Sequence, residues 1–591
     1  MKRKRILVLT LALALTLAMM SGCGGTSPAA SAPSEESVAV SAAEPSTQEA
    51  AESTPSEEEP AEEPVEAPSE EPAEASSEEP EETEEPEIPE RASVEYPICD
   101  PDELEFSIFT SAGGMGVSVE TLDQFPAYIL AHEATGVKTT YRLAAPEATE
   151  VNMNLMIASG DFTTFFTGLD MYYSSGRSAA IADEVVVDLA DYLDEYAPDY
   201  MNLVDANPGM EKLITTDAGE YPFIAPKAAE SYSGLCIRKD WLDALGLEIP
   251  ETYDEMTEVL GAFKNAYGCS DAMLLSSKLC GEHNTLCAGF GLDMLRGNIG
   301  SLAFEAPDGQ VELFVQGEGF VDYMKILADW NAKGFITNYL QVGPFNSTNY
   351  VADDSCGVWV SGNSCFADSW VDAYYTGAYE FEAIPIADIT KTPGEAVNVG
   401  GLEVSIDGEH AWSVTTSCED VGAAVQWLNW WYTEEGSLAA NFGVEGEHYT
   451  MEDGTPVFTD VILNDDSGYG VMYAISSKLG SATPATQHPA RRDPRNTLEN
   501  EVQQSVKDIW FPENRGTAWT CYGDMTAEES EIYGAKAGDV GTYMEEYMGK
   551  VLEGSVNIDE TYQEMLDNCF AMGLQQILDV KQAAYDRYME R

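Results

Sequence analysis

The stretch that decides the fold reads GLCIRKDWLDALG at residues 234–246. Its first residues form a short apolar strand, which runs directly into a helix that ends at Gly246. Nearer the N-terminus, the sequence predicts strands at 104–109 and 139–143, with helices at 119–133 and 151–157. Strands that alternate with helices are typical of an α/β fold with a largely parallel sheet.

Helical patterns dominate the remainder of the chain. Thr252 and Glu255 have the spacing of a capping box, in which each side chain satisfies a free backbone N–H at the start of a helix. Apolar stripes with helical periodicity follow at 256–263, 421–432 and 540–551. Residues 559–588 are also predicted to be helical, with a break near Gly573. We therefore expect a helix-rich C-terminal part.

The N-terminus carries an export signal. Four basic residues, 2–5, precede an apolar run from Ile6 to Met20. A basic start, a short apolar core and small residues before a cleavage point are typical of a secretory signal. The sequence Met20-Ser21-Gly22-Cys23 resembles the bacterial lipoprotein box, in which the cysteine is acylated and becomes the new N-terminus. This resemblance implies a signal peptide at 1–22 and a membrane anchor at Cys23, although Met20 stands where Leu is most common.

A spacer follows the anchor, and we predict a disordered linker at 23–95. Residues 31–95 hold 23 Glu, no Asp and a single basic residue, Arg91. Such a segment has almost no apolar surface to bury, so nothing offsets the entropy lost on ordering it. Its prolines and mutually repelling charges favour extended conformations.

The folded remainder, 96–591, is long enough for two lobes with separate cores. The whole chain has a formal net charge of −75. An acidic surface repels phosphate backbones, so nucleic acid is not an expected partner. The chain contains 11 cysteines without a CxxC pair, and export would permit disulfides such as Cys356–Cys365 or Cys280–Cys287. Free buried thiols are an equally valid interpretation.

Five segments together resemble a known family. They are the turn at 158–161, the strand-to-helix unit at 237–247, the helix start at 252–255, and the segments 443–449 and 582–588. In this order and behind a lipoprotein signal, they resemble the lipid-anchored extracellular solute-binding proteins of bacterial ABC transporters, in the family 1, carbohydrate-type group.

The resemblance implies a periplasmic-binding-protein-like fold of two α/β lobes that close on a ligand about a hinge. We expect lobe 1 at about 96–222 and 382–450, and lobe 2 at about 226–380 together with 451–591. The chain would cross between the lobes near 221–226 and near 381–385. Family members often carry a calcium-binding loop after the helix at 252. Residues 262–271 lack the alternating oxygen ligands and the terminal Glu of such a loop, so we expect no calcium there. No other metal site and no cofactor is predicted, and the sequence leaves open whether a metal binds elsewhere.

Sugars bind to flat aromatic faces and to planar polar groups in a largely apolar cleft. Candidate ligand-binding residues therefore lie near predicted loop ends. They are Ser159, Gly160, Asp161, Tyr232, Arg238, Trp359, Asn363, Trp370 and Trp412. For each tryptophan, the alternative role is packing in a core. For Arg238, the ligand role is to bind the carboxylate of an acidic sugar, and the alternative role is a structural salt bridge.

The function implied is capture of a carbohydrate, expected to be an oligosaccharide, and its delivery to permease subunits. We expect a lipid-anchored monomer on the extracellular face of the cell membrane of a Gram-positive-type bacterium. Two binding alternatives are a surface glycan-capture or sensor lipoprotein, and a receptor for a non-sugar solute. The sequence lacks HExxH, GxSxG and phosphate-cradling motifs, and His448 is expected to be structural, so we expect no enzyme. A pair of carboxylates for glycoside hydrolysis is the remaining enzymatic alternative.

Overall fold

The computed structural model describes the following residues: 91–111, 120–145, 148–173, 176–228, 233–275, 284–292, 302, 304–306, 309–336, 354–362, 381–395, 397, 405–467, 471–480, 482–486, 491, 493–498, 501–510 and 524–591. All of them belong to one compact unit, Thr83–Arg591. Within it, two four-stranded sheets each define a lobe.

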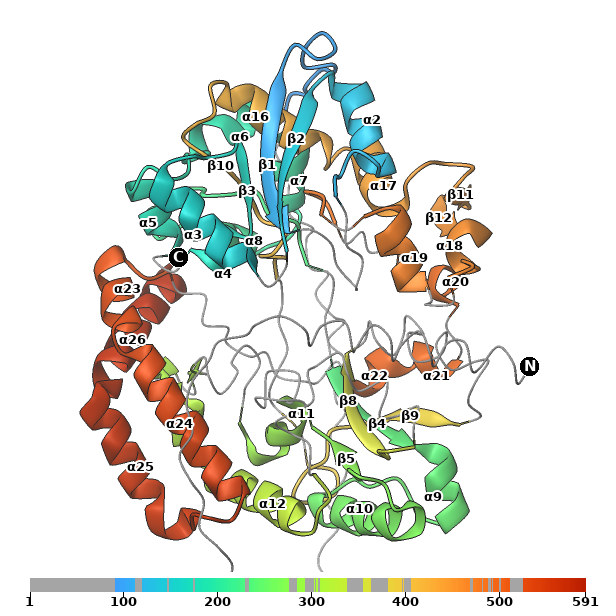
Figure 1. Cartoon of the computed structure of the whole chain (residues 1–591), viewed down its shortest axis with the longest axis vertical. Coiled ribbons are helices and arrows are strands. Elements are labelled where there is room, and N and C mark those ends of the chain that lie inside the picture. The colour runs from blue at the N-terminus through green and yellow to red at the C-terminus, as the bar shows by residue number, and fades with distance from the viewer. Residues whose placement is uncertain are drawn as a thin grey trace, which may run out of the picture. The chain divides into compact units, whose positions relative to one another are not determined.

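The sheet of the N-terminal lobe has the strand order β10-β3-β1-β2. β1 (Glu105–Ser111) is parallel to β2 (Lys138–Ala144) and to β3 (Phe165–Thr167), whereas β10 (Trp412–Val414) is antiparallel to β3. The strands predicted at 104–109 and 139–143 are thus confirmed (Figure 1).

Helices cover both faces of this sheet because its strands alternate apolar side chains between two cores. Phe106 and Ile108 of β1 pack in the larger core, whereas Phe109 packs in the smaller one. The larger core takes α2 (Pro126–Thr135), α6 (Ala190–Tyr196), α7 (Pro198–Asp205), α8 (Met210–Ile214), α16 (Val421–Trp430) and α17 (Glu434–Phe442). The smaller core takes α3 (Thr149–Ser159), α4 (Leu169–Tyr172) and α5 (Arg177–Ala182).

Two boundaries differ from the sequence predictions. The helix expected at 119–133 begins only at Pro126, because proline has no N–H to donate and is suited to the first helical position. The linker expected to extend to residue 95 ends earlier. The Nε atom of Arg91 donates to Asp194 at 3.0 Å, and the side chain of Gln426 donates to the carbonyl of Glu95 at 2.7 Å.

The sheet of the C-terminal lobe has the order β5-β8-β4-β9. β4 (Ser233–Arg238) is antiparallel to β8 (Val358–Gly362) and β9 (Ala383–Ile386), and β5 (Met273–Leu274) is parallel to β8. A short hairpin of β6 (Phe304–Glu305) and β7 (Glu312–Leu313) lies in the same lobe. The lobe's helical elements are α9 (Lys239–Leu245), α10 (Tyr253–Tyr267), α11 (Asn284–Cys287), α12 (Phe320–Ala332) and the 3-10 turns Ala288–Phe290 and Phe314–Gln316.

The decisive stretch behaves as predicted. β4 passes directly into α9, and Gly246 ends that helix with a left-handed backbone, φ 66°. The capping box of Thr252 and Glu255 starts α10. The apolar stripe of α10 is buried in the lobe's core.

Two antiparallel segments connect the sheets. The backbone of Ile224 pairs with that of Trp412 through hydrogen bonds of 2.7 and 2.9 Å, and Ala228 donates to the carbonyl of Ser405 at 2.8 Å. We call 221–228 and 405–412 the crossing segments. The first was predicted at 221–226. The second was expected near 381–385, but residues 383–386 are β9, which is held in the C-terminal sheet by four pairs with β4.

Residues 451–591 were expected to belong wholly to lobe 2, but they are shared between the two lobes. Their first part packs on the N-terminal lobe through α17. This part comprises β11 (Tyr449–Glu452), β12 (Thr455–Phe458), α18 (Asp460–Leu463), α19 (Val471–Lys478) and α20 (Pro494–Thr497). The phenol of Tyr432 donates to the carbonyl of Pro484 at 2.6 Å, and Asn441 donates to Ala485 at 2.7 Å.

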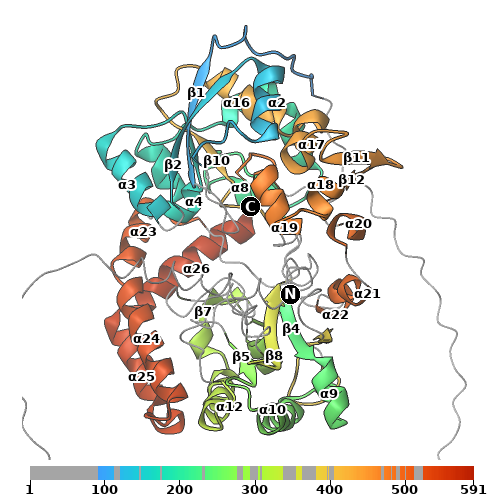
Figure 2. The same cartoon turned by 45° about the vertical axis from the view of Figure 1, so that its right-hand side comes forward.

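The last helices return to the C-terminal lobe. α21 (Glu501–Gln504) and α22 (Val506–Trp510) lie against β9. Figure 2 shows both helices beside β4 of the same sheet. α23 (Ala527–Gly534), α24 (Ala537–Leu552), α25 (Ile558–Met572) and α26 (Leu574–Glu590) follow, and α24 to α26 share that lobe's core. The predicted break at Gly573 is confirmed, with φ 111° between α25 and α26.

Candidate functional site

The strand order of the N-terminal lobe points to one edge of its sheet. The chain passes from β1 to β2 on one side and then back to β3 on the other, so the direction of winding reverses between β1 and β3. In open α/β sheets, ligands bind at such a switch point, outside the carboxyl ends of the strands. The carboxyl ends here are Thr110-Ser111 of β1 and Thr167-Gly168 after β3, where the hydroxyls of Thr167 and Thr110 are 2.9 Å apart.

The second crossing segment runs along the same edge. The backbone N–H of Gly168 donates to the carbonyl of Ala411 at 3.0 Å. A Cβ atom on Gly168 would lie 2.7 Å from Cε2 of Tyr172, so only glycine, here with φ 71°, lets that ring come so close. Both the switch point and the connection between lobes therefore meet at Gly168.

Tyr172 and two carboxylates lie at this edge. Burial raises the pKa of the half-buried phenol of Tyr172, and the carboxylates of Glu409 and Glu150 raise it further. Met171 beside it is 57% exposed and lies next to Gly408 of the crossing segment. An aromatic ring with an exposed apolar neighbour and hydroxyl and carboxylate acceptors offers both kinds of contact that a sugar needs.

The crossing segment contains a histidine–aspartate pair at this edge. Nδ1 of His410 lies 2.7 Å from Oδ2 of Asp407, and the backbone N–H of His410 donates to Oδ1 at 3.2 Å. Burial alone would raise the pKa of Asp407. The hydrogen bonds from His410 outweigh burial, and the pKa of the carboxyl lies below its usual value. The pair fixes the local turn of the crossing segment.

The C-terminal lobe turns a corresponding edge toward the crossing segments. β4 begins at Ser233, five residues after the first crossing segment, and Ser233 pairs with Gly362 at the carboxyl end of β8. β8 therefore ends at the edge nearest the connection. The predicted ligand-binding residues Asn363 and Trp370 lie outside the described residues, as do Tyr232 and Cys23.

The turn at Ser159, Gly160 and Asp161 lies at the opposite edge of the N-terminal sheet. α3 starts at the carboxyl edge and runs antiparallel to the strands, so its C-cap, Gly160, is near their amino ends. The guanidinium of Arg142 donates two hydrogen bonds, of 2.9 and 3.1 Å, to the carboxylate of Asp161. These bonds lower the pKa of Asp161. This placement argues against a ligand role for these three residues.

Arg238 is a structural residue. Its side chain is 4% exposed and pairs with Asp240 at 2.6 Å and with Asp354 at 2.5 Å. The guanidinium also lies over the rings of Trp241 and Phe381, at 4.4 and 4.9 Å from their centroids. It stands at the end of β4 remote from Ser233, so the structure favours the salt-bridge alternative.

Two predicted tryptophan platforms are core residues. Trp359 is 1% exposed and packs with Cys236 and Trp510. Trp412 is fully buried between Phe165 and Trp427. A buried face cannot stack on a sugar, so the packing alternative holds for both. His448 is also buried, where its Nδ1 accepts from the N–H of Val444 at 3.2 Å.

Sequence reasoning missed the edge residues Tyr172, Glu409, Glu150 and Met171. The signal that could have found them is the short strand before Gly168, followed four residues after that glycine by Tyr172 and Tyr173. That strand has only three residues. Its position beside β1 is set by the topology, which the sequence pattern did not reveal.

The described residues hold neither a membrane-spanning helix nor a metal-binding cluster of side chains. No helix there has the length and apolar character needed to cross a membrane. The same residues contain no group of three or more His, Cys, Asp and Glu side chains that could hold a metal ion.

Two α/β lobes joined by paired crossing segments, with a switch-point edge at the connection, define a two-lobe binding protein. The model of the bacterial extracellular solute-binding protein family matches residues 118–437. The chain belongs to this family.

Two relatives with assigned binding roles resemble parts of the chain. The chain is 25% identical over 320 residues to the fructooligosaccharide ABC transporter substrate-binding protein FusA of Streptococcus pneumoniae, a match covering 50% of this chain and 55% of FusA. It is 34% identical over 114 residues to the polygalacturonan/rhamnogalacturonan-binding protein YtcQ of Bacillus subtilis, covering 19% of this chain and 22% of YtcQ. The matches thus span about half, or less, of these relatives' length.

Solved structures share the fold. The alginate-binding protein AlgQ2 without calcium superposes with a TM-score of 0.68 at 22% identity, covering 83% of this chain and all of AlgQ2. A solute-binding protein for HMO from Bifidobacterium longum infantis gives 0.65 at 17% identity, covering 83% and 99%. These likenesses confirm the predicted two-lobe α/β fold.

Proposed function

We propose that this protein is the extracellular receptor of a bacterial ABC importer and that it binds an oligosaccharide between its two sheet edges. The observation that carries the proposal is the meeting of the switch-point edge, Gly168 to Tyr172, with the crossing segment at Gly408–Ala411. Residues at such a point contact a ligand and also sense rotation of the lobes.

The chemistry of this edge supports a sugar. The ring of Tyr172 supplies an apolar face, and Glu409, Glu150 and Ser111 supply acceptors for hydroxyl groups. Two exposed carboxylates beside the ring favour a neutral sugar over an acidic one. By name, FusA binds a fructooligosaccharide, whereas YtcQ and AlgQ2 bind acidic polysaccharides, so the preference for a neutral sugar rests on the two carboxylates beside the ring.

The experiment is a thermal-shift screen of the full chain against neutral fructooligosaccharides, acidic oligogalacturonides and short peptides. A ligand that binds only the folded chain stabilises it by about 2.7 kcal/mol at ~100 times its Kd. A shift with a neutral oligosaccharide supports the proposal. A shift with peptides alone would contradict the carbohydrate assignment, and turnover of a sugar would contradict the binding role.

Anchoring belongs to the same proposal. The lipoprotein-like sequence at Met20–Cys23 places a diacylated cysteine ahead of an acidic spacer, which would hold the receptor in the plane of its permease. A thermodynamically stable attachment takes more than one acyl chain, which diacylation provides. Cofractionation of the chain with a cognate permease would favour transport over a stand-alone glycan-capture role.

A further inference from the structure

The last helix, α26, is attached to both lobes. Leu574, Ile577 and Leu578 are buried in the core of the C-terminal lobe. The side chain of Gln582 donates to the carbonyl of Gly309 at 3.0 Å and accepts from the N–H of Val311 at 2.7 Å. Up to residue 582, the helix thus belongs to the C-terminal lobe.

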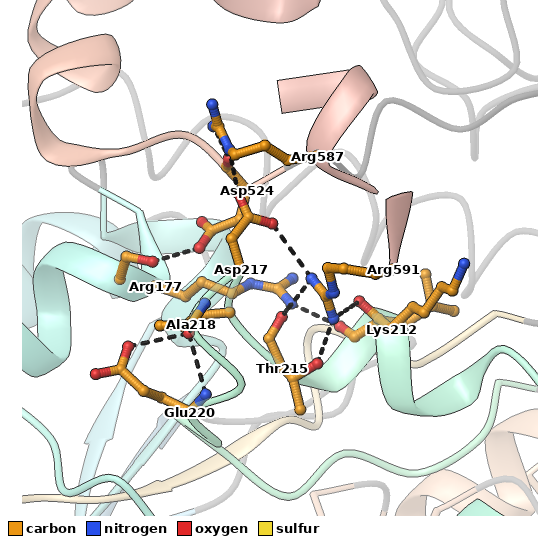
Figure 3. Close-up of polar contacts among 12 residues, drawn as sticks. Arg177, Lys212, Thr215, Asp217, Ala218, Glu220, Asp524, Arg587 and Arg591 are labelled. Atoms are coloured by element: carbon orange, nitrogen blue, oxygen red, sulfur yellow. Dashed lines mark hydrogen bonds and ion pairs between the residues drawn. The ribbon is translucent and has the colours of Figure 1, made fainter. Parts of the chain in front are cut away.

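Within the next turns the same helix contacts the N-terminal lobe. Arg587 forms an ion pair with Asp217, and Tyr588 packs at the edge of the N-terminal core. Arg591 donates to the carbonyl of Lys212 at 3.1 Å and pairs with Asp217 at 3.3 Å (Figure 3). Five residues of helix span only about 7.5 Å, so the change of lobe is abrupt.

The contacts at this end form a partly buried network, not a surface pair. The side chains of Arg587, Asp217 and Glu529 are 29%, 18% and 16% exposed. Arg587 binds both oxygens of Glu529, at 2.9 and 2.6 Å, and donates to the carbonyl of Asp524 at 2.7 Å. Paired, partly buried charges of this kind are screened little by salt and hold their geometry.

The network contacts the N-terminal lobe through Asp217, which lies in the loop that precedes the first crossing segment. Arg177, which is 7% exposed, donates to the carbonyls of Leu213 and Thr215 at 2.6 and 3.4 Å. The same guanidinium lies 5.1 Å from the ring centroid of Phe223, inside the crossing segment. The end of α8 and the loop at 215–220 therefore connect the end of α26 to the first crossing segment through the buried guanidinium of Arg177.

We infer that α26 is a strap that limits how the lobes rotate, with Arg587 and Arg591 as its hold on the N-terminal lobe. The chain passes between the lobes at the two crossing segments and once more between α20 and α21. The contacts of α26 add an attachment outside these connections, which restricts twisting of the lobes and leaves one direction of closure. The inference concerns the chain without ligand and does not depend on the identity of the solute.

The test measures the distance between the lobes by double electron–electron resonance. Spin labels are attached through an unnatural amino acid at Glu133 on α2 and Glu258 on α10, both exposed. The full chain is compared with the double variant Arg587→Ala/Arg591→Ala. The control is Lys550→Ala, which breaks an exposed pair with Glu546 inside α24 at 3.3 Å.

We expect a narrow distance distribution for the full chain and for the control. The double variant should give a broader distribution with a new population. If it does not fold, as judged by circular dichroism and a cooperative melt, Asp217→Asn is measured instead and should broaden the distribution less. A folded variant whose distribution matches that of the full chain would overturn the inference.

Discussion

Gly234 lies directly beneath the indole ring of Trp510. A Cβ atom at residue 234 would stand 2.2 Å from Cδ1 of that ring. The indole N–H donates to the carbonyls of Leu235 and Ile386, at 3.3 and 3.1 Å, and so ties α22 to the start of β4. The first strand of the C-terminal lobe is therefore fixed by a residue 275 positions later in the chain.

The substitution Gly234→Ala should destabilise the fold by about 1–3 kcal/mol, because the added methyl group overpacks a closed contact. Thermal melting monitored by circular dichroism measures this. The matched control is Gly549→Ala inside α24, where an added Cβ meets no atom within 4 Å. There we expect stabilisation of about 0.5–1 kcal/mol from helix propensity. Equal effects at the two glycines would contradict the packing described.

Trp412 should behave as a core residue and not as a ligand platform. It is fully buried in the N-terminal core, and Trp412→Ala should cost about 3–5 kcal/mol by leaving a cavity. Urea unfolding gives the free energy. A Trp412→Phe variant, which leaves a smaller cavity, should lose less stability and keep ligand binding. Full stability of Trp412→Ala with loss of binding alone would contradict this account.

The pair of Asp407 and His410 predicts a pH dependence of stability. The pKa of Asp407 is lower in the folded chain than its usual value of 3.8. Its contribution to stability is therefore complete above the usual pKa and is lost as the pH falls through the folded pKa. Melting temperatures measured from pH 6 down to pH 3 should fall less steeply in Asp407→Asn than in the unmodified chain. Parallel curves would show that the pair does not contribute.

Cys23 gives a prediction about anchoring. Labelled palmitate should be incorporated by cells that express the full chain, and the Cys23→Ala variant should lose the label. A variant that still carries the label would contradict the anchor at this residue. Ligand binding is expected to survive the substitution, because the folded domain begins far along the chain from residue 23.

Much of the fold could be predicted because it depends on local patterns. The passage from β4 into α9, the capping box at Thr252 and the break at Gly573 each follow from the residues within a few positions. The second crossing segment could not be predicted, because its pairing with Ile224 joins residues 188 positions apart. The site was predicted less well for the same reason. Aromatic residues near loops look alike in sequence, and only the topology separates the buried Trp359 from the half-buried Tyr172.

The most direct test of the central claim is calorimetric titration of three forms of the full chain with a neutral fructooligosaccharide. The forms are the unmodified chain, Tyr172→Ala at the carboxyl edge and Asp161→Asn at the amino edge. We predict binding by the unmodified chain and by Asp161→Asn with equal affinity. For Tyr172→Ala we predict a loss of tenfold or more, about 1.4 kcal/mol. Unchanged affinity in Tyr172→Ala together with lost binding in Asp161→Asn would contradict the account.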